Sequence, residues 1–291
     1  MGEDIAKPGG LDVPPSVSNS TALPAPLPAA SLGDHVVGSF SQVATIFAYE
    51  ARKLSHDPTE LLLRAVQPAL WLVVFGSVFS VIHAIPTGSL TYLQFLTPGI
   101  LAQSVLFVAI FYGIATIRER ELGIVTKFLV SPTPRIALVG GRALSASIRG
   151  FSQAVIVFLL AIALGVTLNW TPLAILGVLL AIVLGSALFS TLSMIIASLV
   201  KTQERFLGIG QLMTMPLFFA SNAIYPVSIM PAWLRVVTDF NPLTYLVDAL
   251  RQLMVPGAAM QFPLGVDFGV LAAVTLGLIW LESLLYPRMA Q

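Results

Sequence analysis

One long basic stretch, residues 118–149, lies between two runs of sequence without acidic or basic residues. It holds six of the chain's fifteen Lys and Arg residues and only two acids, Glu119 and Glu121. The flanking runs, residues 65–117 and 150–200, contain no Asp, Glu, Lys or Arg. A basic loop between two lipid-length apolar runs is typical of the cytoplasmic side of a membrane protein. We therefore expect an integral membrane protein that a cytosolic partner contacts at this stretch.

Composition leads to the same class and excludes several others. Hydrophobic residues make up 56% of the chain and charged residues 10%, whereas about a quarter of a soluble domain is charged. The net charge of +1 gives no field that would attract nucleic acid. The chain has no cysteine, and His35, His56 and His83 do not have the spacing of metal ligands. We expect no metal, no cofactor in this chain and no nucleic-acid partner.

Six apolar segments have about the 20 residues needed to cross a hydrocarbon core of about 30 Å. They are residues 64–84, 96–117, 150–168, 173–199, 206–225 and 264–286. The third and fourth are separated by a predicted turn at Asn169, Trp170, Thr171 and Pro172. With both termini in the cytosol, only Arg235 and Arg251 of the fifteen basic residues lie outside. This bias favours a multi-pass protein with cytosolic termini.

The first 60 residues differ from the rest. Residues 1–35 are rich in Pro, Ser and Ala and have no apolar period, which predicts a disordered cytosolic tail. They do not have the pattern of a cleaved secretory signal. Residues 36–60 have apolar residues near helical period and the basic pair Arg52 and Lys53, which favours an amphipathic helix at the inner leaflet. A short soluble helix packed on the membrane domain, residues 61–291, is the alternative.

Within the basic stretch, alternating Arg and Glu at residues 118–121 predict a short charged helix directly below the second span. Anchoring to lipid head groups does not need interleaved acids, so we interpret this helix as a docking site for a cytosolic partner. The residues assigned to it are Arg118, Glu119, Arg120, Glu121, Gly123 and Thr126. Arg135, Arg142 and Arg149 recur every seven residues, which places them on one side of a helix leading into the third span. For Arg142 and Arg149, head-group anchoring stays an open alternative.

Residues 225–263 are too polar to span a membrane and too apolar for a solvated loop. Pro231 opens one short predicted helix, and Asn241 followed by Pro242 opens a second, with Asn as N-cap. We expect a re-entrant helical hairpin that packs against the fifth span from outside. An apolar stripe is predicted on one face of the second helix, with Asp248 and Arg251 paired on the other. The site residues assigned here are Asn241, Pro242, Tyr245, Asp248 and Arg251.

These two segments resemble the signatures of ABC-2 type transporter permeases, particularly the daunorubicin-resistance exporter group. The first comprises residues 118–121 with Leu-Val-Ser-Pro at 129–132, and the second comprises Asn-Pro-Leu-Thr-Tyr at 241–245 with residues 247–251. The likeness covers about residues 40–288. It implies an all-α membrane protein in the bacterial cytoplasmic membrane, a dimer of six-span subunits. Each subunit would have an interfacial helix, a coupling helix after the second span and a re-entrant hairpin before the sixth.

The energy source distinguishes the possible functions. No Lys follows a Gly in the chain, so the P-loop Gly-Lys-Ser/Thr is absent, and a separate ATP-binding subunit, in two copies with its ATP and Mg, is the expected partner. A secondary carrier would place ionisable residues at membrane depth; spans two to five contain none, and Glu282 lies near the cytosolic end of the sixth. An intramembrane enzyme would need a base beside a nucleophile, and no span serine has an intramembrane His. A passive channel stays open.

The expected substrate is hydrophobic or amphipathic, such as a drug, an antibiotic or a lipid, because the apolar spans offer no charged selector. A polysaccharide or glycolipid is the alternative substrate. The sequence does not decide between them, nor between a homodimer and a heterodimer.

Overall fold

Helices joined by turns make up the part of the chain that the structure describes, residues 65–82, 85–122, 135–200 and 202–286 of a computed structural model, with no strand in those ranges. Four helices are long and apolar enough to cross a membrane. They are α4 (Tyr92–Glu121), α6 (Arg135–Ala163), α7 (Pro172–Leu199) and α11 (Leu264–Leu285). The predicted all-helical class is confirmed. The predicted tail (1–35) and interfacial helix (36–60) lie outside the described residues.

Two shorter apolar helices occupy the positions of the first and fifth predicted spans. The first is continuous from residue 65 to residue 82, with a π-helical segment, η1 (Leu70–Phe75), followed by α3 (Gly76–Ile82). The second, α8 (Gln203–Phe219), has 17 residues and carries Pro216 near its end. Because a straight crossing takes about 20 residues, the count of six spans stays a prediction.

Local sequence signals account for where the long helices begin. At the start of α4, the Thr91 side chain accepts a hydrogen bond from the Gln94 amide while the Gln94 side chain accepts one from the Thr91 amide, a complete capping box. Before α7, Asn169 Oδ1 accepts a hydrogen bond of 3.1 Å from the Thr171 amide, and Pro172 is the first helical residue. The predicted break between these two spans is present, but it begins earlier than predicted, because α6 ends at Ala163 and the connection runs from residue 164 to residue 171.

Small residues bring the long helices close together. α4 packs most extensively against α7, where the Gly113 amide donates a 2.9 Å hydrogen bond to Ser193 Oγ. Gly150 of α6 lies directly against Ser186 of α7, so a larger residue there would clash. Both serines are buried. The contacts of these two hydroxyl residues are those of close helix packing.

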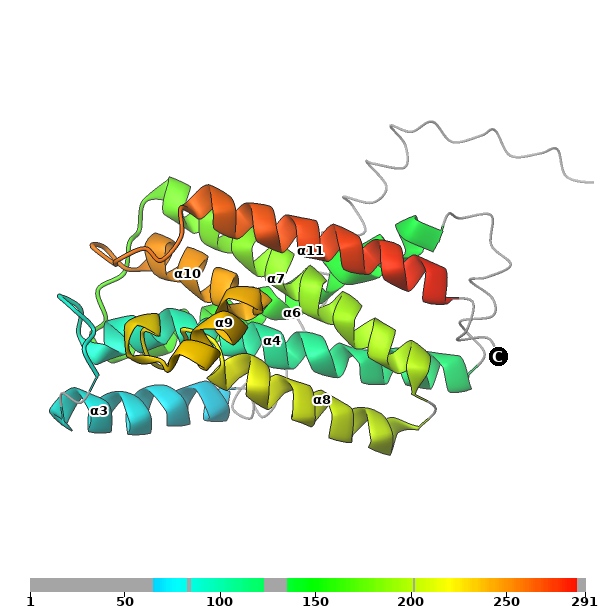
Figure 1. Ribbon diagram of the computed structural model, residues 1–291, viewed down its shortest axis with the longest axis horizontal. Coiled ribbons are helices and arrows are strands. Elements are labelled where there is room, and N and C mark those ends of the chain that lie inside the picture. Colours follow the sequence, from blue (N-terminus) through cyan, green and yellow to red (C-terminus); the bar gives the residue numbers. More distant parts are fainter. Residues whose placement is uncertain (1–64, 83–84, 123–134, 201, 287–291) are drawn as a thin grey trace, which may run out of the picture. The chain divides into compact units, whose positions relative to one another are not determined.

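The helices run back and forth, so their connections gather at two ends (Figure 1). The connections between α3 and α4, between α6 and α7, and between α10 (Pro242–Met254) and α11 lie at the left-hand end. We call it the hairpin end, after the helical hairpin of α9 (Ala232–Phe240) and α10. The ends of α4, α7 and α11 and the starts of α6 and α8 lie at the other end, which we call the basic end. Hydrogen bonds between distant residues support this arrangement. The Asn169 amide donates to the Met254 carbonyl at the hairpin end, and the Arg120 side chain donates to the Val200 carbonyl at the basic end.

Candidate functional sites

The charged residues 118–121 form the last turn of α4. The sequence predicts a separate short helix here, but α4 continues without a break to Glu121 and ends at Leu122, whose amide bonds back to the carbonyls of Arg118 and Arg120. The apolar span and the charged turn are therefore parts of one continuous helix. Gly123 and Thr126, the other two residues assigned to this site, lie outside the described residues.

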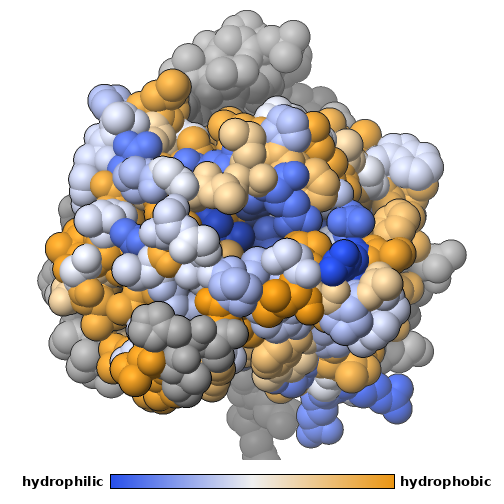
Figure 2. All heavy atoms as spheres, turned by 60° about the vertical axis from the view of Figure 1, so that its left-hand side comes forward, coloured by the Kyte–Doolittle hydropathy of each residue, from blue (hydrophilic) through white to orange (hydrophobic). Residues whose placement is uncertain are grey.

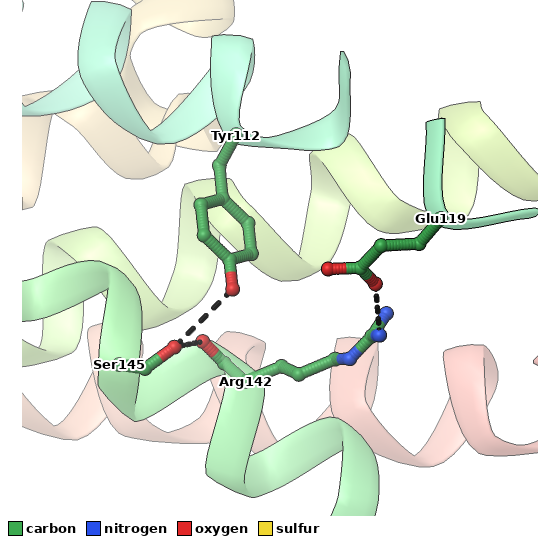
Figure 3. Close-up of polar contacts among 4 residues, drawn as sticks. All are labelled: Tyr112, Glu119, Arg142 and Ser145. Atoms are coloured by element: carbon green, nitrogen blue, oxygen red, sulfur yellow. Dashed lines mark hydrogen bonds and ion pairs between the residues drawn. The ribbon is translucent and has the colours of Figure 1, made fainter. Parts of the chain in front are cut away.

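Glu119 of α4 forms an ion pair with Arg142 of α6 (Figure 3). The exposed fraction of the side chain is 15% for Arg142 and 34% for Glu119. Figure 3 also shows Ser145, whose hydroxyl donates to the Arg142 carbonyl at 2.8 Å and lies 3.3 Å from the Tyr112 hydroxyl of α4. Head-group anchoring is thus not needed to account for Arg142, because its side chain connects α6 to the charged turn.

Arg120 and Glu121 connect the same turn to α7 and α8. The Arg120 guanidinium donates to the carbonyls of Ala197 at 3.2 Å and Val200 at 2.9 Å, at the end of α7, where a helix does not supply its own donors. Glu121 accepts a longer hydrogen bond, 3.4 Å, from Gln203 Nε2 at the start of α8. The alternation of Arg and Glu thus has a role within the chain, since consecutive side chains reach different helices.

Two residues of this turn still present their charge to the outside. Arg118 and Glu121 are exposed, whereas Glu119 and Arg120 are only partly exposed. Among the four charged residues of this turn, Arg118 and Glu121 are therefore the most accessible.

Glu282, near the end of α11, is fully buried. Neither of its carboxylate oxygens has a hydrogen-bond partner among the described residues, and Arg142 acts on it electrostatically. The sequence places Glu282 near Arg288, which lies outside the described residues. Glu282 lies near Arg142 because α11 packs against α6, and no local sequence pattern predicts this.

At the hairpin end, the two short helices are α9 (Ala232–Phe240) and α10 (Pro242–Met254). The predicted starts are confirmed: Pro231 precedes α9, and Asn241 Oδ1 caps α10 by accepting from the Leu243 amide at 3.0 Å. The side-chain Nδ2 of Asn241 donates to the Leu217 carbonyl of α8 at 2.7 Å. The Tyr245 hydroxyl donates to the Asp239 carbonyl of α9 at 2.7 Å. These bonds hold the hairpin together and fix it to the end of α8; its depth in a membrane stays a prediction.

Asp248 and Arg251, which the sequence predicts on the polar face of α10, each bond to groups outside that helix. Both are buried, with exposed fractions of 1% and 4%. Asp248 accepts from the Gln261 amide at 3.1 Å and the Phe262 amide at 2.9 Å. Arg251 donates to the Asn222 carbonyl at 2.7 Å and lies over the Phe95 ring, 3.9 Å from its centroid. α10 is therefore covered on its polar face as well as on its apolar stripe.

Four polar residues that the sequence does not single out complete this cluster. Gln252 Nε2 donates to Asp248 at 3.1 Å and to Asp267, in the first turn of α11, at 3.0 Å. Asn222 donates to Gln261 Oε1 at 3.1 Å. The signal that could have indicated Asp267 is an acid inside an apolar segment. No three His, Asp or Glu side chains in the described ranges are grouped as metal ligands.

Comparisons with known proteins identify the family. The family model described as ABC-2 type transporter matches residues 41–255, more than half of the chain. A transport permease, ycf38, of Cyanophora paradoxa is 30% identical over 224 residues, 75% of this chain and 76% of the relative. The daunorubicin resistance ABC transporter permease protein DrrB1 of Streptomyces coeruleorubidus is 25% identical over 234 residues, 80% of each chain. A protein named probable multidrug ABC transporter permease YbhR, from Escherichia coli strain K12, is 30% identical over 178 residues, 60% of this chain and 47% of the relative.

The matched region includes α4, α6, α7, α8 and the α9–α10 hairpin. It therefore contains the charged turn of α4 and most of the polar cluster at the hairpin end. With its apolar helices and no ATPase motif of its own, this chain belongs to the ABC-2 type transporter family, as a multi-pass membrane permease subunit.

Proposed function

We propose that the permease exports a hydrophobic or amphipathic substrate, such as a drug, an antibiotic or a lipid, using ATP hydrolysed by a separate subunit. The observation that carries this proposal is the last turn of α4, which exposes Arg118 and Glu121 while Glu119 and Arg120 bind α6 and α7. A force applied to the exposed residues would act on α4 directly and on α6 and α7 through these contacts. The names of the drug-resistance relatives support this substrate class, and a polysaccharide or glycolipid is the second candidate.

In the proposed assembly, two permease subunits form a homodimer of six-span chains in the bacterial cytoplasmic membrane, and two ATP-binding subunits dock at the basic end. ABC-2 permeases generally work with an ATP-binding subunit, and the positions of the basic residues support a cytosolic location of this end.

The docking step is tested by reversing the two exposed charges together, Arg118→Glu with Glu121→Lys. Attraction to the ATPase then becomes like-charge repulsion, so co-purification of the ATPase and ATP-dependent transport in proteoliposomes should both be lost. Glu119 is left unchanged because its reversal would also break the ion pair with Arg142.

Two controls accompany this test. The double variant should keep the membrane abundance and unfolding temperature of the parent, since both side chains are exposed. Arg205→Glu, an exposed charge at the start of α8, should leave docking intact. Retention of docking by the double variant, with its loss in Arg205→Glu, would move the docking site to α8. Transport without ATP would instead indicate a channel.

The proposed topology is tested by labelling with a membrane-impermeant maleimide. The chain has no cysteine, so every signal comes from the introduced residue. Cysteines at Ser89 or Thr171 should label in intact cells, and those at Thr126 or Thr202 only after permeabilisation. The reverse pattern would overturn the assignment of the hairpin end to the outside.

A further inference from the structure

A cavity of about 310 Å³ opens at the hairpin end beside α10. Its walls include the apolar side chains of Leu90, Phe95 and Met260, and its floor includes Asp248 and Arg251. Figure 2, which brings this side of the molecule forward, shows a hydrophilic hollow framed by hydrophobic surface. A small cavity that combines apolar walls with a few polar groups is typical of a site for a small molecule.

The floor of the cavity is held rigid. Asp248 accepts three hydrogen bonds, from Gln252 Nε2 and from the amides of Gln261 and Phe262. Arg251 is fixed by the Asn222 carbonyl and by the Phe95 ring. These contacts join four separate parts of the chain, so the floor is formed before any ligand arrives, which lowers the entropic cost of binding.

Two buried polar atoms of this floor lack a hydrogen-bond partner among the described residues. They are the donor Arg251 Nε and the acceptor Asn222 Oδ1, and each belongs to a side chain that lines the cavity. Buried polar groups are normally paired. Hydroxyl groups suit both kinds of atom, because a hydroxyl accepts a hydrogen bond from a donor such as Nε and donates one to an acceptor such as Oδ1.

We propose that this cavity binds the hydroxylated polar end of an uncharged amphipathic molecule, such as an alkyl glycoside. The floor contains one acid and one base, Asp248 and Arg251, so it offers no net charge to attract an ion. The apolar walls contact the first part of the alkyl chain. Binding belongs to the permease alone and needs no ATPase, so a negative result here would leave the proposed export function standing.

The test uses the full chain carrying Met260→Cys, reconstituted in phosphatidylcholine nanodiscs. Met260 lines the cavity and is 67% exposed, so its cysteine is accessible when the cavity is empty. Hexyl glucoside at about ten times its half-protecting concentration should slow maleimide labelling about tenfold. Hexyl sulfonate and hexyltrimethylammonium, which carry a charge on the same alkyl chain, should protect much less. A second set of discs contains a glucosyl diacylglycerol and tests whether a membrane lipid with the same sugar head group also protects the cysteine. Protection by hexyl glucoside or by the glycolipid supports the proposal.

Two matched variants make the result specific. Thr171→Cys, at the same end but outside the cavity, should label at an unchanged rate. Ser228→Trp, added to Met260→Cys, fills the mouth from an exposed position without touching the floor, and should abolish protection while the unfolding temperature is kept. Absence of protection by both glycosides, equal protection by the charged analogues, or protection that survives Ser228→Trp would each overturn the proposal.

Discussion

Two acid–base pairs at opposite ends of the permease are held in opposite ways. At the basic end, Glu119 and Arg142 form a direct ion pair that is partly exposed. At the hairpin end, Asp248 and Arg251 are almost completely buried, and each is held mainly by amides, carbonyls or an aromatic ring. The first arrangement connects helices through a contact that water can compete for, whereas the second builds a fixed interior.

The physical reason is the loss of water. A buried ion has to replace its hydration shell with several fixed partners, which a single opposite charge does not provide. Burial lowers the pKa of the Arg251 guanidinium to about 10, and the charge of Asp248 opposes this shift. Arg251 therefore stays charged at neutral pH. Substitutions at the hairpin end should mainly change stability, and those at the basic end should mainly change coupling to a partner.

The largest effect is expected for Arg251→Ala. Removing the guanidinium leaves the Asn222 carbonyl without its donor and Asp248 without the nearby positive charge, so the free energy of unfolding should fall by about 3–5 kcal/mol. Denaturant unfolding of the detergent-solubilised protein measures this loss. Arg235→Ala is the matched control: its side chain is exposed and donates to the Ser228 and Met230 carbonyls, so the loss should be only about 1 kcal/mol. Equal losses would contradict the comparison.

Asp248→Asn should have the next largest effect. An amide oxygen accepts more weakly than a carboxylate, and its NH2 group would face the donors of Gln261 and Phe262. We expect a loss of about 1–3 kcal/mol. Hydrogen exchange should speed up at these two amides and stay unchanged at the Thr171 amide, which bonds to Asn169 elsewhere at this end. Unchanged exchange at Gln261 and Phe262 would show that Asp248 does not hold this loop.

A charge swap at the basic end should have a smaller effect on stability. Glu119→Arg and Arg142→Glu each place like charges opposite one another, and the double variant restores an opposite pair. The coupling energy between the two positions should be about 0.5–1 kcal/mol, because the pair is partly exposed. A double-mutant cycle on unfolding and on transport measures it. A coupling energy of zero in both measurements would show that the ion pair contributes neither to stability nor to transport.

The smallest change in stability is expected for Arg118→Glu. This exposed side chain should change the free energy of unfolding by less than about 0.5 kcal/mol, while lowering the affinity for the ATPase subunit. Titration of the ATPase onto nanodisc-bound permease measures the affinity. A large loss of stability would mean that Arg118, like Glu119, is part of the interior network.

Much of the fold can be predicted from local sequence, because local chemistry sets it. Asn241 followed by Pro242 determines where α10 begins, and Asn169 with Pro172 determines the turn before α7. The apolar stripe of α10 follows from helical period, and all of its members are buried. They are Leu243, Leu246, Val247, Leu250 and Met254. The partners of the charged residues could not be predicted in this way. Glu119 meets Arg142 and Arg120 meets Val200 only because α4, α6 and α7 pack together.

The sequence by itself determined that this is a helical membrane protein, because long runs without charge are stable in lipid, and two of its segments carried the resemblance to ABC-2 permeases. It also determined which short segments differ from plain spans. Only the tertiary structure decided that Asp248 and Arg251 are interior residues and that Glu119 and Arg120 bind other helices of the same chain, leaving Arg118 and Glu121 exposed. The reason is that burial depends on what covers a helix face, and the residues that cover these faces come from distant parts of the chain.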